Sequence, residues 1–372
     1  MSDATRTFSF GFSGEPQLLD TTALAVRIAA SYRVAAAEFA GHGDSMWATF
    51  SVQQAPVIEA IRNNDIVSLG RLLADPSSND FLWGYDDLLK TFTEIRMQHP
   101  DQAESGARPI YDALVQVGIG VGAIPCPYPE GGQGNPEPPI EVLLRAIDTV
   151  FGFKVDFPNP FKMNFGIETS RGIASARAVQ AIYQAWRINQ ILRYISGERV
   201  LEIGAGLGRN AYYARKFGIV DYTIVDIPTT QIGQGYFLSR VCAETEVSMY
   251  GEPPATINLR SPDWVRQTDE QFDLILNVDS LTEMDPAVAR RYIKFARDHA
   301  RAFLSINHEV NPVVVRDLFR EVGIKPVGRS PYWPRAGYVE ELVLQPELQR
   351  GSKLLGPLAR FWRRWACKFG NR

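Results

Sequence analysis

A glycine-rich segment between two acidic residues is the part of the sequence best suited to hold a ligand. Gly204, Gly206 and Gly208 allow a tight turn and a close approach of the backbone to a bound molecule. Asp226 follows an apolar run, where its carboxylate is placed to accept hydrogen bonds from both hydroxyls of a ribose. Glu202 stands just before the turn and would repel a pyrophosphate. A tight turn without a ligand is the structural alternative to a nucleoside site.

The turn departs from the dinucleotide-binding pattern G-x-G-x-x-G, because Arg209 stands where the third glycine would be. NAD is therefore disfavoured. S-adenosylmethionine offers a ribose to Asp226, and its ammonium and sulfonium cations are compatible with Glu202. Residues 202–208 match E-x-G-x-G-x-G, and the chain here resembles the class I S-adenosylmethionine-dependent methyltransferases. The residues expected to bind this cofactor are Glu202, Gly204, Ala205, Gly206, Gly208, Asp226, Ile227, Asn277 and Arg171.

Alternating apolar and helical patterns predict the elements that carry these residues. The expected strands cover residues 198–203, 222–225, 247–250, 271–277 and 302–306, and the expected helices cover residues 210–217, 231–240, 286–297 and 313–322. A hairpin-like pair whose second strand covers residues 338–344 would supply an antiparallel edge strand. The alternation predicts an α/β fold with a doubly wound, Rossmann-like and mostly parallel sheet.

Polar side chains follow two later strands of this predicted sheet. Asn277, Asp279 and Glu283 come after one strand, and His308 and Glu309 come after the next. Since ligands bind at the carboxyl ends of such strands, His308 is the leading candidate for a base, with an ordinary pKa of about 6.5. Alternatively, Asp279, Glu283 and Glu309 hold Mg²⁺, which acidifies a bound hydroxyl. The structural alternative is that the loop carboxylates cap the following helix.

The region before the predicted sheet reads as helical. Helices are expected over residues 22–39, 55–73 and 140–150, with a glycine- and proline-rich loop, connection or lid over residues 117–139. A long helix capped by Thr169 or Ser170 is expected to end before Gly197. The segment 166–171 is expected to fold over the cofactor, where Arg171 would pair with its carboxylate.

These patterns divide the chain into three parts. A mainly helical N-terminal region covers residues 1–160 and would select the substrate or form a dimer, and a methyltransferase-like domain covers residues 161–350. In residues 351–372, arginines and a lysine interleave with leucines, phenylalanines and tryptophans, which predicts a basic amphipathic helix. Such a helix either lies on an anionic membrane surface or covers an apolar seam of this chain or of a partner subunit.

The composition is that of an ordinary globular protein. Of 372 residues, 45% are hydrophobic and 22% are charged, and the net charge of -3 argues against a nucleic-acid partner. The three cysteines, Cys126, Cys242 and Cys367, lack metal-ligand spacing and do not form a disulfide framework. With no signal peptide or spanning segment recognised, we expect a cytoplasmic protein, peripheral to the inner membrane face if the C-terminal helix binds lipid.

A narrower resemblance covers about residues 160–345. The blocks YTIVDIPTTQIGQGYFLSRV, NVDSLTEMDPAVARRYI, FLSINHE and RSPYWPRAGYVEELV, in this order, are similar to a family of sugar O-methyltransferases. The resemblance implies methyl transfer from S-adenosylmethionine to a sugar hydroxyl of a glycan or glycosylated natural product. Tyr332, Trp333 and Tyr338 suit stacking on a sugar, or core packing. The alternatives are a methyltransferase of a nonsugar small molecule and a noncatalytic binding or assembly subunit, with homo-oligomerisation left open.

Overall fold

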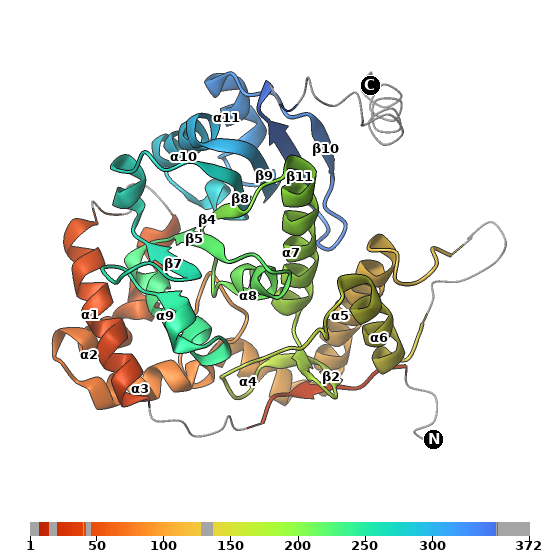
Figure 1. Cartoon of the computed structure of the whole chain (residues 1–372). Helices are drawn as coiled ribbons and strands as arrows, with labels where there is room; N and C mark the ends of the chain where they lie inside the picture. Colours follow the sequence, from red (N-terminus) through yellow and green to blue (C-terminus); the bar gives the residue numbers. More distant parts are fainter. Residues whose placement is uncertain are drawn as a thin grey trace.

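The structure is a computed structural model that describes residues 7–14, 21–39, 41, 46–127, 137–346 and 348. A large sheet lies at its centre, with helices on both faces and a helical N-terminal region beside it (Figure 1). The expected C-terminal amphipathic helix lies outside the described residues. No helix within the described ranges is long and apolar enough to cross a membrane.

The central sheet has eight strands in the order β10-β11-β9-β8-β4-β5-β7-β6. All neighbouring strands are parallel except at β11, which is antiparallel to both β9 and β10. The strands are β4 (Arg199–Ile203), β5 (Asp221–Val225), β6 (Val247–Ser248), β7 (Ile257–Arg260), β8 (Phe272–Val278), β9 (Ala300–His308), β10 (Gly328–Pro331) and β11 (Tyr338–Leu344). The predicted doubly wound, Rossmann-like α/β fold is confirmed.

Alternate residues of β4 pack on opposite faces of the sheet, because successive side chains of a strand point in opposite directions. Val200 joins the core under α7 (Ala176–Ile195), α8 (Arg209–Lys216) and α9 (Pro228–Val241). Leu201 and Ile203 join the second core, under α10 (Pro286–His299) and α11 (Val315–Val322). Burial on both faces explains why Val200, Leu201 and Ile203 of β4 are all apolar.

Two details of the sheet differ from the sequence prediction. The expected hairpin lies at the edge of the sheet, but its antiparallel member, β11, is the second strand and β10 forms the edge. β7 was not predicted, and it lies between β5 and the expected third strand β6. Its four residues, Ile-Asn-Leu-Arg, are too few to give a clear strand pattern, although Ile257, Asn258 and Leu259 are all buried.

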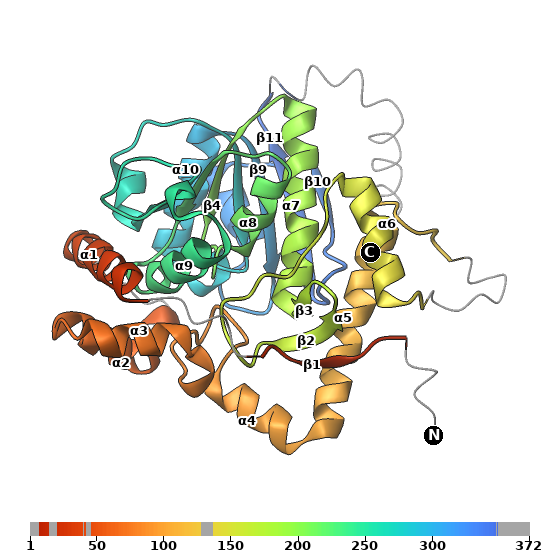
Figure 2. The ribbon, with the colours of Figure 1, turned by 60° about the horizontal axis from the view of Figure 1, so that its bottom comes forward.

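The N-terminal region contains six α-helices within the described ranges. They are α1 (Thr22–Glu38), α2 (Ser51–Arg62), α3 (Ile66–Ala74), α4 (Lys90–Gln98), α5 (Pro100–Gly120) and α6 (Ile140–Phe151). The helix expected over 55–73 is two helices, since Asn64 between them has a positive φ of 55°. α1 packs along α9, so this region contacts the sheet domain directly (Figure 2).

A small three-stranded sheet also joins the two regions. β1 (Phe10–Phe12) pairs with β2 (Phe165–Thr169), which pairs with β3 (Gly172–Ala174). A strand from the start of the chain therefore pairs with a strand beyond the expected boundary at residue 160.

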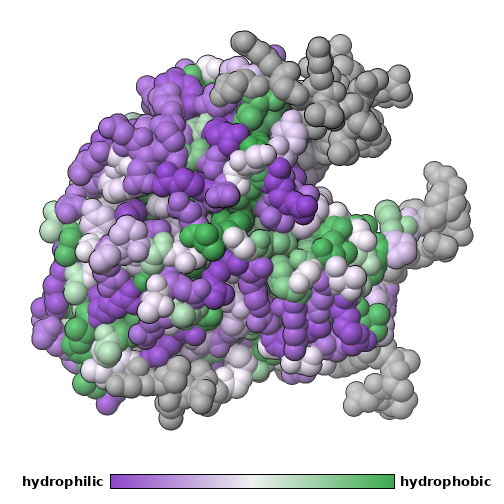
Figure 3. All heavy atoms as spheres, viewed as in Figure 1, coloured by the Kyte–Doolittle hydropathy of each residue, from purple (hydrophilic) through white to green (hydrophobic). Residues whose placement is uncertain are grey.

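On the face seen in Figure 3, polar side chains predominate and apolar ones form small patches.

The β2–β3 hairpin corrects the predicted start of the long helix. Thr169 and Ser170 lie in the hairpin and cap no helix. Ser175 is the N-cap of α7, and its hydroxyl accepts a hydrogen bond from the Ala178 N–H at 3.3 Å. Ser170 instead binds Glu141 through its own N–H and hydroxyl at an exposed position.

We therefore expect Ser175→Ala to lower the free energy of unfolding by about 1 kcal/mol, because it removes the cap of a buried helix. Ser170→Ala should change it by less than about 0.5 kcal/mol, since its hydroxyl makes only an exposed contact. Urea denaturation of both variants measures the difference. Equal effects of the two substitutions would contradict the assignment of the cap.

Candidate active site

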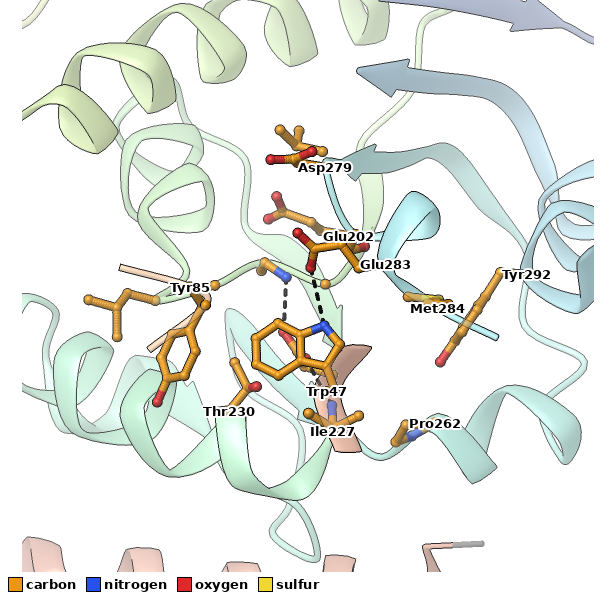
Figure 4. Close-up of a pocket in the computed structure, with 18 of the residues that line it drawn as sticks. Trp47, Tyr85, Glu202, Ile227, Thr230, Pro262, Asp279, Glu283, Met284 and Tyr292 are labelled. Carbon is orange, nitrogen blue, oxygen red and sulfur yellow. Dashed lines mark hydrogen bonds between the residues drawn. The ribbon is translucent and has the colours of Figure 1, made fainter. Parts of the chain in front are cut away.

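The described residues form a cavity at the carboxyl ends of β4, β5 and β8 (Figure 4). One wall is the glycine turn after β4, and another begins at Asp226 after β5. A third wall is the loop after β8, which includes Asp279 and Glu283. The N-terminal region closes a further side with Trp47 and Tyr85. Segments far apart in the sequence thus converge on one site.

The turn after β4 requires glycine. Gly204, Gly206 and Gly208 have φ values of 71°, 57° and 81°, which side chains of L-residues rarely adopt. A Cβ atom on Gly204 would also lie 2.2 Å from the Ser280 hydroxyl oxygen. The turn therefore brings bare backbone to the cavity, as the sequence predicted.

Asp226 ties this turn to the end of β5. Its Oδ2 accepts hydrogen bonds from the Ala205 N–H at 3.0 Å and from Gln234 Nε2 at 2.7 Å, and its Oδ1 accepts one from the Ile227 N–H at 2.9 Å. Burial raises the pKa of this carboxyl to about 7. Because a carboxylate has about four acceptor positions, Oδ1 keeps capacity for a ligand hydroxyl.

Glu202 lines the same cavity but is held by the protein. It is 1% exposed, and its carboxylate accepts hydrogen bonds from Asn210 Nδ2 at 2.6 Å and the Tyr222 hydroxyl at 2.8 Å. Burial raises its pKa to about 7. An ionised Glu202 would be stabilised by a cation in the cavity.

Asn277 makes hydrogen bonds beneath the cavity lining that hold the glycine turn in place, although it was expected to contact the cofactor. Its side chain is fully buried and does not line the cavity. Its Nδ2 donates to the Ile203 carbonyl at 2.9 Å and to the Ser280 hydroxyl at 2.5 Å, and its Oδ1 accepts from Asn307 Nδ2 at 2.9 Å. Asn277 therefore joins the ends of three strands.

Arg171 does not reach the cavity, which corrects its predicted role. Its guanidinium pairs with Asp148 at 2.8 Å and donates to the Val155 carbonyl at 3.0 Å, because the hairpin places it against the end of α6. Arg177, in the first turn of α7, lines the cavity instead. Its nearest carboxylate partner is Asp87, at 3.6 Å.

Asp279 and Glu283, in the loop after β8, bring two further carboxyl groups to the cavity. Asp279 has a φ of 60°, and its Oδ2 accepts hydrogen bonds from Arg335 Nη1 at 2.8 Å and the Tyr338 hydroxyl at 2.5 Å. Glu283 Oε2 accepts one from the Trp47 indole N–H at 3.2 Å. Burial and the charge of Asp279 raise the pKa of Glu283 to about 8.

His308 lies behind Asp279 and does not line the cavity. Its Nδ1 accepts a hydrogen bond from the Val310 N–H at 3.2 Å, so the proton of the neutral ring is assigned to Nε2. That nitrogen faces Asp279 Oδ1 at 3.4 Å. With one nitrogen occupied and the other protonated, the ring is poorly placed to take a proton, whereas Glu283 lines the cavity.

The three carboxylates expected to hold Mg²⁺ do not converge. Glu309 pairs with Arg329 at 3.0 Å and lies 3.8 Å from Arg316, outside the cavity. The Oδ2 atom of Asp279 is already bound by two donors. Among the described residues, no group of three or more candidate ligands is arranged to hold a metal ion. The predicted metal site is therefore corrected, because the side chains expected to be its ligands lie apart.

The aromatic residues of the cavity also differ from those expected. Tyr332 is 2% exposed and its hydroxyl accepts from Gln184, while Trp333 packs on Tyr183 with ring centroids 4.4 Å apart. Neither lines the cavity. Trp47 and Tyr85 do, with ring centroids 6.0 Å apart. Neither residue belongs to a recognisable motif or follows a predicted strand, so local patterns did not indicate them.

The sequence matches no family model and no curated protein. Among solved structures, it is similar to the S-adenosylmethionine-dependent methyltransferase SibL, with 14% identity over 44% of this chain and a TM-score of 0.32. The chain covers 56% of SibL, which is little more than half of that protein.

Two further solved structures are similar over the same share of the chain. The glycopeptide N-methyltransferase MtfA has 18% identity and a TM-score of 0.34, over 44% of this chain and 95% of MtfA. The magnesium protoporphyrin IX methyltransferase of Synechocystis PCC 6803, with bound S-adenosylhomocysteine, has 14% identity and a TM-score of 0.32, over 45% of this chain and 84% of that protein.

The raised pKa values of Glu202, Asp226 and Glu283 predict a specific dependence of stability on pH. In the unfolded chain such carboxyls have pKa values of about 4, so between about pH 4 and 8 the folded state binds more protons. The contribution of these groups to stability is therefore full below about pH 4 and is lost as the pH rises through 7 and 8.

We expect the melting temperature of the ligand-free protein to fall between about pH 6 and 8.5, and Glu283→Gln to make this fall shallower. Scanning calorimetry across this range measures both slopes. Glu309→Gln, which removes a carboxylate outside the cavity, is the matched control and should leave the slope as in the unsubstituted protein. A slope unchanged in Glu283→Gln would show that this carboxyl ionises normally.

Proposed function

We propose that this chain is a methyltransferase that moves a methyl group from S-adenosylmethionine to a hydroxyl of a sugar. One observation carries the proposal. A single cavity is lined by the glycine turn and Asp226 and also by Asp279 and Glu283. The turn and Asp226 suit a nucleoside, and the two carboxyl groups of the loop after β8 suit a group that must lose a proton.

The residues present fit the proposed cofactor. Asp226 keeps acceptor capacity on Oδ1 for a ribose hydroxyl, and the turn at Gly204 allows close backbone approach. Glu202 and Asp226 place buried carboxylates where a cationic ligand is favoured over a pyrophosphate. Of the three arginines that line the cavity in the described part of the chain, Arg177 is the one we propose for the cofactor's carboxylate, a role predicted from the sequence for Arg171.

Bound S-adenosylmethionine would supply an electrophilic methyl group: the acceptor oxygen would bond to the methyl carbon as the carbon–sulfur bond breaks, and that bond's electron pair would stay on sulfur. Glu283 then takes the hydroxyl proton. Its pKa of about 8 lies close to neutral pH, which is favourable for a general base because proton affinity and availability are balanced. Arg335 and Tyr338 hold Asp279 in place, and Asp279 keeps the proton affinity of Glu283 high.

The lining of the cavity supports a sugar as acceptor. Trp47, which contacts Glu283, offers aromatic surface, on which the apolar face of a sugar ring stacks well. Gln180, from α7, adds an amide that is suited to hydroxyl groups. Asp279 and Glu283 disfavour phosphorylated or carboxylated acceptors through like-charge repulsion. We therefore propose a neutral sugar hydroxyl in a glycan or a glycosylated natural product.

The cofactor assignment predicts that Asp226→Ala weakens S-adenosylmethionine binding at least tenfold, about 1.4 kcal/mol, because hydrogen bonds to the ribose are lost. Isothermal titration calorimetry measures this. Asp221→Ala is the matched control, since Asp221 begins the same strand and pairs with Arg199 at the opposite edge of the sheet. Asp226→Asn preserves the side-chain shape if the alanine variant disturbs the turn. Unchanged affinity in both Asp226 variants would exclude the ribose assignment.

The base assignment predicts that Glu283→Gln lowers the rate of methyl transfer about 100-fold with little change in cofactor affinity. The assay follows tritiated methyl incorporation into a panel of neutral glycosides. Glu309→Gln should transfer at close to the normal rate, and His308→Asn should lose far less activity than Glu283→Gln. If His308→Asn loses as much activity as Glu283→Gln, histidine must be restored as the base.

A further inference from the structure

The N-terminal region contributes directly to the part of the cavity that Glu283 lines. Trp47 lies in a short 3-10 helix, Met46–Phe50, and is 236 positions away from Glu283 in the chain. Its indole N–H donates a hydrogen bond to Glu283 Oε2 at 3.2 Å. Figure 4 shows the indole nitrogen turned toward the carboxylate across the cavity.

Trp47 is held by rings on two sides. Phe50 packs edge-on against it with centroids 5.4 Å apart, and Tyr85 lies 6.0 Å away at a tilt. Gly84 leaves room for the indole, because a Cβ atom there would lie 3.2 Å from Trp47 Cη2, and the backbone has a φ of 94° that favours glycine. The direction of the indole N–H is therefore fixed by packing.

Glu283 has few other restraints. It ends a short 3-10 turn, Leu281–Glu283, and the described part of the chain offers its carboxylate no hydrogen-bond donor besides Trp47. Arg177 and Arg335 act on it only through their charge. Without the indole, this long side chain would be free to change rotamer, so its position over the cavity depends on Trp47.

Resting on the function proposed above, we propose that Trp47 is a positioning residue that aims the Glu283 carboxylate at the acceptor hydroxyl. The N-terminal region would then do more than enclose the substrate, since it would complete the group that accepts the proton. Trp47 itself exchanges no proton or methyl group and acts only through Glu283.

The contact also has an electrostatic consequence. A donor to the ionised carboxylate favours the charged form, so the Trp47 N–H lowers the pKa of Glu283 against the larger, opposite effect of burial. Removing the N–H while keeping an aromatic ring should therefore raise the pH at which Glu283 ionises. A purely structural role of Trp47 would not move this pH.

Trp47→Phe tests the inference, with Trp83→Phe as the matched control. Trp83 belongs to the same region, packs on Phe92 and does not line the cavity. The first measurement needs no acceptor. Infrared spectroscopy measures the pH midpoint of the carboxylic C=O band of Glu283, which is identified as the band that Glu283→Gln removes. The second measurement is the pH dependence of methyl transfer to neutral glycosides.

We expect Trp47→Phe to raise the infrared midpoint by about one pH unit and to lower transfer near pH 7 about tenfold, with unchanged cofactor affinity. The rising limb of the pH–rate profile for methyl transfer should move to higher pH by the same amount. Trp83→Phe should change neither quantity. Trp47→His, which keeps a ring N–H, should return the midpoint toward its normal value.

An infrared midpoint that stays in place in Trp47→Phe would overturn the role of Trp47. This outcome is separate from failure of the proposed function, which would be seen as no methyl transfer by the unsubstituted protein while cofactor binding and the infrared titration are both observed. Equal shifts in Trp47→Phe and Trp83→Phe would also overturn the inference, because they would reflect a general loosening of the N-terminal region.

Discussion

The buried hydrogen bonds of Asn277 are the constraint on which the site depends most directly. This side chain, in the interior of the sheet, connects the Ile203 carbonyl at the end of β4, Asn307 on β9 and Ser280 in the loop after β8. A buried polar group left without partners costs about 1–3 kcal/mol, so these contacts hold one another in place. The glycine turn and the loop bearing the two carboxylates are thereby fixed relative to each other.

The cavity combines this rigid base with an unusual density of carboxyl groups. Glu202 and Asp226 have pKa values of about 7, and Glu283 has one of about 8, with burial as the main cause in each case. Desolvated acids with raised pKa values commonly mark functional sites. Here the ionised forms of these buried carboxyl groups are energetically costly at neutral pH. A ligand that carries positive charge would therefore be favoured in the cavity.

Local sequence patterns were sufficient for the glycine turn and for most strands of the central sheet, but not for β7. The expected strand at 338–344 has the bounds of β11, and Asp226 was correctly placed at the end of β5. These features depend on residues close together in the chain. Asn277 was placed at the right strand end, but its pattern could not reveal that the side chain turns into the sheet.

The remaining errors involve partners that are distant in the chain. The β2–β3 hairpin pairs with β1, whose residues lie more than 150 positions earlier, so Thr169 and Ser170 read as a helix cap. Arg171 was misplaced with them, whereas Arg177, in the first turn of α7, was overlooked. Trp47 carries no recognisable motif, and its importance follows only from the carboxylate that it meets.

The separation of Trp47 and Glu283 also bears on how the protein matures during synthesis. Contacts between distant segments form late, because a long stretch of chain must be closed to make them. Trp47 leaves the ribosome early and has no carboxylate to bind until β8 and its following loop have emerged. The glycine turn at 204–208 is translated before that loop, so a nascent chain would contain the turn before it contained Glu283.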